Sequence, residues 1–189
     1  MNRPGLGRNK PARRVLRASG RSPELHCMVI PTDGETLLLP TSVMEEVIDF
    51  EQPVAIEHAP PWLLGYGQWQ SRQVPVFSFS ALINGVDVGE ITARSKVMIL
   101  KSLAHSGRVP YLGLLLGDLP HPASIKPDEL VETGDEKKSL GVFKRVRLGG
   151  DEIIIPDLDR VAHLVTHATF GALPITRLDK EDDWETQPS

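Results

Sequence analysis

Two histidines and one cysteine are the residues of this chain best suited to holding a metal. His163 and His167 stand four apart in a segment predicted to be helical, which is the spacing of a zinc-binding helix. The residues between them include no glutamate, and nothing in the sequence indicates a third ligand. The single cysteine, Cys27, excludes an internal disulfide framework and a cysteine-based zinc cluster. The sequence therefore predicts no metal site.

Motifs for nucleophilic and phosphate chemistry are incomplete. The Gly-x-Ser-x-Gly turn that presents a hydrolase serine does not occur. Gly5–Lys10 matches a phosphate-binding loop only in part, because no predicted strand precedes it and the closing Gly-Lys-Ser is missing. We therefore expect no catalytic residue and no cofactor, so the chain is not expected to be an enzyme.

The tetrapeptide Gly149-Gly150-Asp151-Glu152 matches the four-letter signature of bacterial diguanylate cyclases. In that family the glycines leave room for the nucleotide and the acids help to hold a metal. Here Ile153 replaces the expected aromatic residue, and no second metal-binding acid follows an earlier strand. Two glycines also suit a tight hairpin turn, because glycine adopts positive φ at little cost. We interpret the tetrapeptide as a turn, and a small nucleotide-handling regulator stays as the alternative function.

Charge divides the chain into three parts. Residues 1–22 carry seven basic side chains and no acid, whereas residues 171–189 carry a net charge of −3. Since the whole chain has a net charge of −4, residues 23–170 carry −8. An acidic body repels nucleic acids and anionic membranes, so neither is expected as a partner. We predict a disordered basic tail over 1–22, one folded domain over 23–170 and an acidic tail over 171–189.

Hydropathy indicates no membrane insertion and no secretion. No apolar run reaches the roughly 18 residues that a membrane helix needs. The N-terminus has positive charge but lacks the apolar segment of a secretory signal. One cysteine in the chain suits a reducing compartment. We therefore expect a cytoplasmic protein.

Most predicted elements that must position any site are short strands. Thr32-Asp33-Gly34-Glu35 is a turn signal between two apolar runs, and Gly149–Asp151 is another, so each is predicted to close a hairpin. Pro75 lies inside an alternating run and marks it as an edge strand or a bulge. The predicted strands are Leu25–Pro31, Thr36–Pro40, Gln73–Phe79, Lys96–Lys101, Val109–Leu116, Val142–Leu148 and Glu152–Pro156.

Helix is predicted in two places only. Apolar residues at 43, 44, 47 and 48 have the spacing of a short helical turn. Asp157 to about Thr166 is predicted as a closing helix after Pro156, and Leu119–Asp135, which is rich in prolines, as a long loop. Two sets of short strands with little helix indicate an all-β fold.

Residues suited to a partner contact lie on the predicted helical turn at 43–48 and at Trp69 and Gln70. On a helical turn Val43 and Val47 would face the core, Met44 and Ile48 would lie one step round, and Glu46 would stay solvated. A flexible thioether beside an exposed acid suits a contact with a helical partner. The alternative is that Met44 belongs to the core and Glu46 only adds solubility. Trp62 is predicted to be core, and Trp69, with Gln70 beside it, a half-exposed contact.

The order of these motifs resembles the CheW-like chemotaxis adaptor family. The matching segments run in sequence over about residues 25–166: Leu39–Val47, Ala59–Gly65, Gln73–Val76, Leu112–Asp118 and Ile154–Asp159. The resemblance implies two small interlocked five-stranded β-barrels with short helical turns and a C-terminal helix. It also implies no catalytic activity and a role between the cytoplasmic tip of methyl-accepting chemoreceptors and a CheA-type histidine kinase.

The family likeness also indicates which residues contact partners. It implies a receptor groove between the barrels and a kinase-facing surface on one barrel. Met44 and Glu46 fall on the segment whose family counterparts contact partners, and with Ile48, Trp69 and Gln70 they form the predicted partner-binding set.

Departures from the family pattern are concentrated in one stretch. Gln70-Ser71 stands where the family usually has Arg-Gly, and Ser78 where it usually has Asp. Glutamine cannot make the charge-assisted, two-pronged hydrogen bond that arginine makes to a carboxylate. The stretch from Trp69 to Phe79 resembles the ChpC branch, which serves type IV pilus chemosensory systems and twitching motility.

Overall fold

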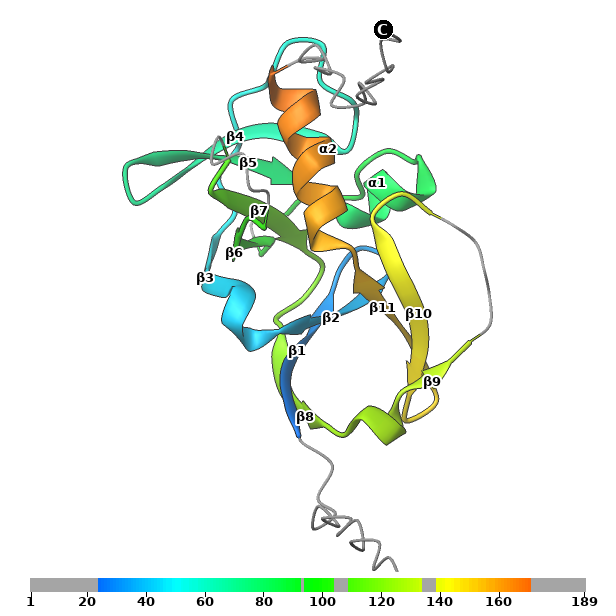
Figure 1. Cartoon of the computed structure of the whole chain (residues 1–189). Helices are drawn as coiled ribbons and strands as arrows, with labels where there is room; N and C mark the ends of the chain where they lie inside the picture. The colour runs from blue at the N-terminus through cyan, green and yellow to red at the C-terminus, as the bar shows by residue number, and fades with distance from the viewer. Residues whose placement is uncertain (1–23, 93, 104–108, 134–138, 171–189) are drawn as a thin grey trace, which may run out of the picture.

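The computed structural model describes residues 24–92, 94–103, 109–133 and 139–170, so the two predicted tails lie outside it. Its strands form two sheets (Figure 1). Sheet A has the strand order β8-β1-β2-β11-β10-β9, and sheet B has the order β3-β6-β7-β5-β4. The prediction of an all-β fold with a C-terminal helix is confirmed. Within the described residues neither hydrogen-bonded ladder closes on itself, and the strands expected in the two small barrels form one sheet of six and one of five strands.

Sheet A combines strands from the two ends of the described chain. Both predicted hairpins are confirmed, and they meet where Leu37 pairs in parallel with Ile154. The strands are β1 (Leu25–Pro31), β2 (Thr36–Pro40), β8 (His121–Ile125), β9 (Val131–Glu132), β10 (Val142–Leu148) and β11 (Asp151–Pro156).

The predicted loop over Leu119–Asp135 is wrong, because this segment contributes β8 and β9. β8 pairs with β1 at the edge of sheet A, with Ala123 opposite Cys27. Pro122 lies within β8, and an edge strand tolerates the missing N–H of a proline. Proline content therefore marked the edge of a sheet here rather than a loop.

Sheet B comes entirely from the middle of the chain. Its strands are β3 (Met44–Asp49), β4 (Leu63–Trp69), β5 (Arg72–Phe77), β6 (Lys96–Lys101) and β7 (Tyr111–Leu116). The expectation of an edge strand or bulge at Pro75 is wrong, since β5 lies between β4 and β7. Its parallel pairing with β7 begins only at Val76, so the missing N–H of the proline falls outside that ladder.

The buried apolar residues form three clusters, and one of them joins the two sheets. The largest contains residues of both sheets and of two helices, α1 (Phe79–Asn84) and α2 (Leu158–Phe170). A second cluster lies within sheet A and a third within sheet B. Each sheet thus has one face in the shared core and another over a cluster of its own.

The two helices were not equally visible in the sequence. The closing helix is confirmed, and the Asp157 carboxylate accepts a hydrogen bond from the Arg160 N–H (2.9 Å) at its start. α1 was missed, since six residues are too few for helical periodicity to show. It is bounded by the Ser78 hydroxyl, which accepts from the Ala81 N–H (3.2 Å), and by Gly85 at φ 65°.

Candidate functional site

The segment expected to be a helical turn is a strand with a bulge. Only Thr41–Val43 is helical, as a single 3₁₀ turn, and β3 follows at once. β3 pairs with β6 so that Met44 faces Leu100 and Glu46 faces Ile99, which leaves Glu45 as an extra residue. One extra residue shifts the alternation, so apolar residues three apart share a face of the strand. The spacing of apolar residues at 43, 44, 47 and 48, which predicted a helical turn, is therefore caused by the bulge at Glu45.

This bulge separates the predicted contact residues. Met44 packs against the core shared by both sheets, together with Val47. Ile48 packs on the opposite face of sheet B, in the cluster that contains Trp69. The set of five predicted residues is thus divided, with Met44 on the inner side of the strand. Glu46, Ile48, Trp69 and Gln70 are brought together.

These four residues line a cavity at the open seam of sheet B, between the terminal strands β3 and β4. We call it the seam cavity, and its volume is about 400 Å³. Apolar side chains of three strands line it: Ile48, Val74, Val76, Val97 and Ile99. Polar side chains also line it: Glu46, Asp49, Glu51, Gln68 and Gln70. The cavity therefore combines an apolar surface with three carboxylates.

Trp69 joins the two strands across this seam. Its indole N–H donates a hydrogen bond to the Glu46 carboxylate at 2.8 Å. Trp69 is only 7% exposed, and its ring meets that of Tyr111 edge to face, with centroids 4.8 Å apart. The Arg72 guanidinium lies 5.5 Å from the centre of the Tyr111 ring. The expectation of a half-exposed Trp69 is wrong, because its ring fills the core of sheet B. Trp62 is partly buried against the shared core.

The turn after Trp69 has an unusual backbone. Trp69 pairs with Arg72, so Gln70 and Ser71 form a two-residue loop. Their φ angles are 43° and 61°, in the left-handed region. Two-residue hairpin loops of this kind favour Asn-Gly or Gly-Gly. The sequence places non-glycine residues at both positions.

The carboxylates along β3 differ in their partners. Asp49 forms an ion pair with Lys96, and Glu45 forms one with Lys101 at 3.2 Å on the exposed side of the strand. Glu46 is held by the Trp69 indole. Within the part of the chain that the structure describes, Glu51 has no hydrogen-bond or ion-pair partner. Sequence reasoning missed Asp49 and Glu51, although four acids between 45 and 51 were a visible signal.

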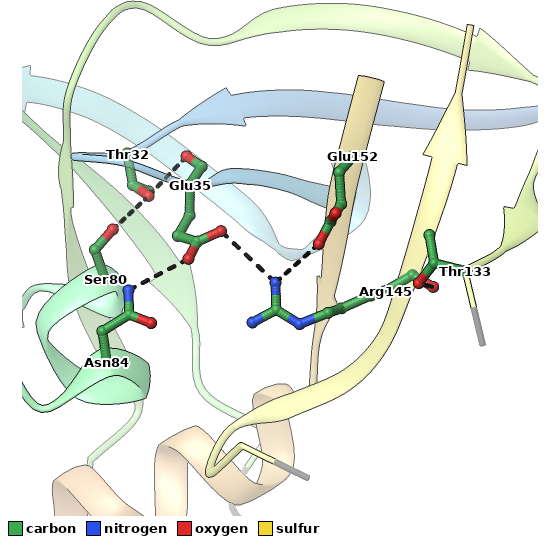
Figure 2. Close-up of polar contacts among 7 residues, drawn as sticks. All are labelled: Thr32, Glu35, Ser80, Asn84, Thr133, Arg145 and Glu152. Carbon is green, nitrogen blue, oxygen red and sulfur yellow. Dashed lines mark hydrogen bonds and ion pairs between the residues drawn. The ribbon is translucent and has the colours of Figure 1, made fainter. Parts of the chain in front are cut away.

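The Gly149–Glu152 tetrapeptide lies at a hairpin turn of sheet A, far from the seam in sequence. Gly149 and Gly150 have φ angles of 62° and 102°, and Asp151 begins β11. The Glu152 carboxylate accepts a hydrogen bond from the Arg145 guanidinium at 3.1 Å (Figure 2). The Glu152 carboxylate thus pairs with a cation of its own hairpin. The tetrapeptide therefore acts as a turn in this structure.

Arg145 is the centre of a polar network that also reaches α1 (Figure 2). Its guanidinium lies 3.8 Å from the Glu35 carboxylate, which accepts a hydrogen bond from the Asn84 amide at 3.3 Å. Next to Glu35, the Thr32 and Ser80 hydroxyls are hydrogen-bonded at 2.9 Å in a buried position. The network links both hairpins of sheet A to the helix that follows sheet B strand β5.

Residues singled out for metal chemistry lie apart from the seam. The His163 imidazole Nε2 lies 3.7 Å from the Asp159 carboxylate on the exposed side of α2. Among the described residues, no group of three or more histidine, cysteine or acidic side chains is arranged to hold a metal ion. Burial raises the pKa of the Cys27 thiol, and this keeps it protonated and poorly nucleophilic.

None of the described helices is both long enough and apolar enough to span a membrane.

Comparisons with known proteins agree with this arrangement. The family model described as "CheW-like domain" matches residues 26–165, which include all of sheet B and all of sheet A except Leu25. The crystal structure of the scaffolding protein TtCheW from Thermoanaerobacter tengcongensis is similar, with a TM-score of 0.59 and 18% sequence identity. The match covers 72% of this chain and 90% of that one, and at this identity it concerns the fold. No curated protein sequence matches the chain.

Proposed function

We propose, on the premise that this chain belongs to the CheW-like domain family, that it is a non-enzymatic scaffold coupling chemoreceptors to a CheA-type histidine kinase. The match over residues 26–165 is the observation that carries the proposal. The similar structure belongs to a protein described as a scaffold, which supports it. The resemblance of Trp69–Phe79 to the ChpC branch favours a type IV pilus pathway.

We further propose that the seam of sheet B provides the partner surface. Glu46 and Gln70 are exposed at the seam cavity, and Ile48 and Trp69 form its apolar wall. The hydrogen bond from Trp69 fixes the Glu46 carboxylate in place, so little side-chain entropy is lost when a partner binds it. Met44 supports the strand from the core side.

A charge reversal at Glu46 tests this surface. We expect Glu46→Lys to weaken binding to the receptor tip or to the kinase's regulatory domain by roughly 5- to 150-fold, the equivalent of about 1–3 kcal/mol for a desolvated charge. Binding is measured by calorimetric titration of each partner. Circular dichroism checks that the variant is folded.

Glu24→Lys is the matched control, because it makes the same charge change just before β1 in sheet A. It should leave both affinities near those of the wild type. If folded Glu46→Lys binds both partners as tightly as Glu24→Lys does, the seam is not the partner surface. If the wild type binds neither partner, the scaffold role itself is refuted.

A further inference from the structure

The seam of sheet B is closed by two contacts, and the two sides of the seam between them differ in length. The Val54 and Tyr66 backbones exchange hydrogen bonds of 2.9 and 2.8 Å. The other contact is the hydrogen bond from the Trp69 indole to Glu46. Val54 stands eight positions after Glu46, whereas Trp69 stands three after Tyr66. The two sides therefore cannot form a continuous ladder between the contacts, and residues of both sides line the seam cavity.

Glycines of β4 fix the shape of this cavity. Gly65 has a φ angle of 135°, and a Cβ atom there would lie 2.2 Å from the Val54 carbonyl oxygen, so the backbone contact requires glycine. Gly67 lines the cavity and shares a face of β4 with the buried Trp69. A Cβ atom at Gly67 would lie 2.9 Å from Val76 Cγ2. The glycines thus leave open a cavity that is formed before any ligand binds.

The cavity is polar at its mouth and apolar at its floor. Its buried aliphatic residues come from β5 and β6: Val74, Val76, Val97 and Ile99. Glu46, Asp49 and Glu51 line it and are exposed, and among the described lining residues none is basic. Lys96 pairs with Asp49, and within the described part of the chain Glu51 has no partner. A matching ligand therefore carries positive charge at one end and an apolar group at the other.

Hydrogen bonding narrows the class of cation. An ionised carboxylate only accepts hydrogen bonds, and a primary ammonium group offers three N–H donors. A quaternary ammonium group has no donor and is bound instead by the faces of aromatic rings. The volume of about 400 Å³ exceeds the roughly 150 Å³ of an apolar cavity that holds benzene. The cavity thus has room for an aliphatic arm as well as the ammonium group.

We propose that the seam cavity binds a small primary amine with an aliphatic arm. The ammonium group lies between Glu46 and Glu51, and the arm lies on the buried aliphatic residues of β5 and β6. Since Glu46 and Gln70 belong to the surface proposed for partners, the bound amine competes with partner binding. The site itself does not depend on the adaptor role, because amine binding is measured on this chain alone.

The test titrates hexylamine into the full chain at neutral pH, where a primary amine is protonated. The NMR signal of the Trp69 indole N–H reports on the cavity wall, and its loss in Trp69→Phe identifies it. We expect this signal to shift and to saturate. Each CH₂ group added between propylamine and hexylamine should tighten binding about three- to fourfold, because more of the arm is buried. 1-Hexanol, with the same arm and no charge, should bind about tenfold more weakly. Hexyltrimethylammonium, which lacks N–H donors, should also bind more weakly.

Two substitutions examine the two ends of the cavity. Glu51→Gln removes an exposed carboxylate and should weaken hexylamine binding about two- to fivefold. Glu132→Gln is the matched control, because it makes the same change on β9 at the edge of sheet A, away from β3 and β4 in Figure 1. Gly67→Ala adds a methyl group to the cavity wall and should weaken hexylamine more than propylamine. Circular dichroism checks that each variant is folded.

Four results would overturn the proposal. A Trp69 signal that hexylamine leaves unmoved removes the site. Equal affinities for hexylamine and 1-hexanol, or equal effects of Glu51→Gln and Glu132→Gln, remove the role of the carboxylates. Equal affinities for hexylamine and hexyltrimethylammonium remove the requirement for N–H donors. Tighter binding of N-acetyl-lysine methylamide than of hexylamine would assign the cavity to a lysine side chain of another protein instead of a free amine.

Discussion

Gln70 and Ser71 have backbone conformations that cost free energy, and they lie beside the seam cavity. A non-glycine residue in the left-handed region costs about 1–2 kcal/mol. Both residues of the turn have this cost, since φ is 43° at Gln70 and 61° at Ser71. The hairpin is fixed by the pairing of Trp69 with Arg72 and by the hydrogen bond from Trp69 to Glu46. Strain of this kind is common at binding sites, where the surrounding structure enforces it.

We expect Ser71→Gly to raise the free energy of unfolding by about 0.5–1 kcal/mol. Relief of the left-handed strain, about 1–2 kcal/mol, exceeds the added entropy of the unfolded chain, about 0.4–1 kcal/mol. Urea unfolding measures the change. Gly149→Ser makes the reverse change at a turn with φ 62° and no atom near its Cβ position, so it should destabilise by a similar amount. An unchanged midpoint in Ser71→Gly would show that the turn relaxes in solution.

Strands and helices were predictable where polar turns or caps bounded them. The hairpins of sheet A follow from Asp33-Gly34 and Gly149-Gly150, and α2 begins where Asp157 caps it. β3 was not predictable as a strand, because its bulge at Glu45 gives the apolar residues a helical spacing. The same error affects the candidate site. Glu46, Ile48, Trp69 and Gln70 were correctly grouped, but Met44 was wrongly placed with them. Which strands meet at a seam depends on long-range pairing, which local pattern does not encode.

The short helix α1 depends on its caps more than on propensity, since six residues form few internal hydrogen bonds. We expect Ser78→Ala to lower the free energy of unfolding by about 1 kcal/mol, because the Ala81 N–H then loses its acceptor in a buried place. Ser78→Asp keeps an acceptor at this position and should retain more of the stability. Guanidinium unfolding compares the three proteins. A loss in Ser78→Asp as large as that in Ser78→Ala would mean that packing, not capping, governs this residue.

Across the whole molecule, one polar network complements the shared apolar core. Arg145 contacts Glu152 of its own hairpin and Glu35 of the other, and Glu35 contacts Asn84 of α1 (Figure 2). The Arg145 side chain is only 13% exposed. Its guanidinium thus joins parts of the chain that are more than 100 residues apart. Removal of such a partly buried charge leaves its partners without compensation.

We expect Arg145→Met to lower the free energy of unfolding by about 1–3 kcal/mol, because Glu35 keeps a partly buried carboxylate without a cation. Thermal and urea unfolding measure the loss. Arg147→Met on the same strand is the control, since Arg147 is exposed and has no described partner. Glu35→Gln in the Arg145→Met background should recover part of the stability. Equal losses in Arg145→Met and Arg147→Met would contradict a role for the network.

The make-up of sheet A has a consequence for how the protein is synthesised. β1 and β2 leave the ribosome well before their neighbours β8 and β11, which belong to residues 121–156. At roughly 5–20 residues per second, the first hairpin waits on the order of 10 s for them. During that time Leu37, Leu38 and Leu39 lack the strand that covers them, whereas sheet B can assemble from residues 44–116 alone. The nascent chain therefore presents its first hairpin to chaperones until β8 and β11 have been synthesised.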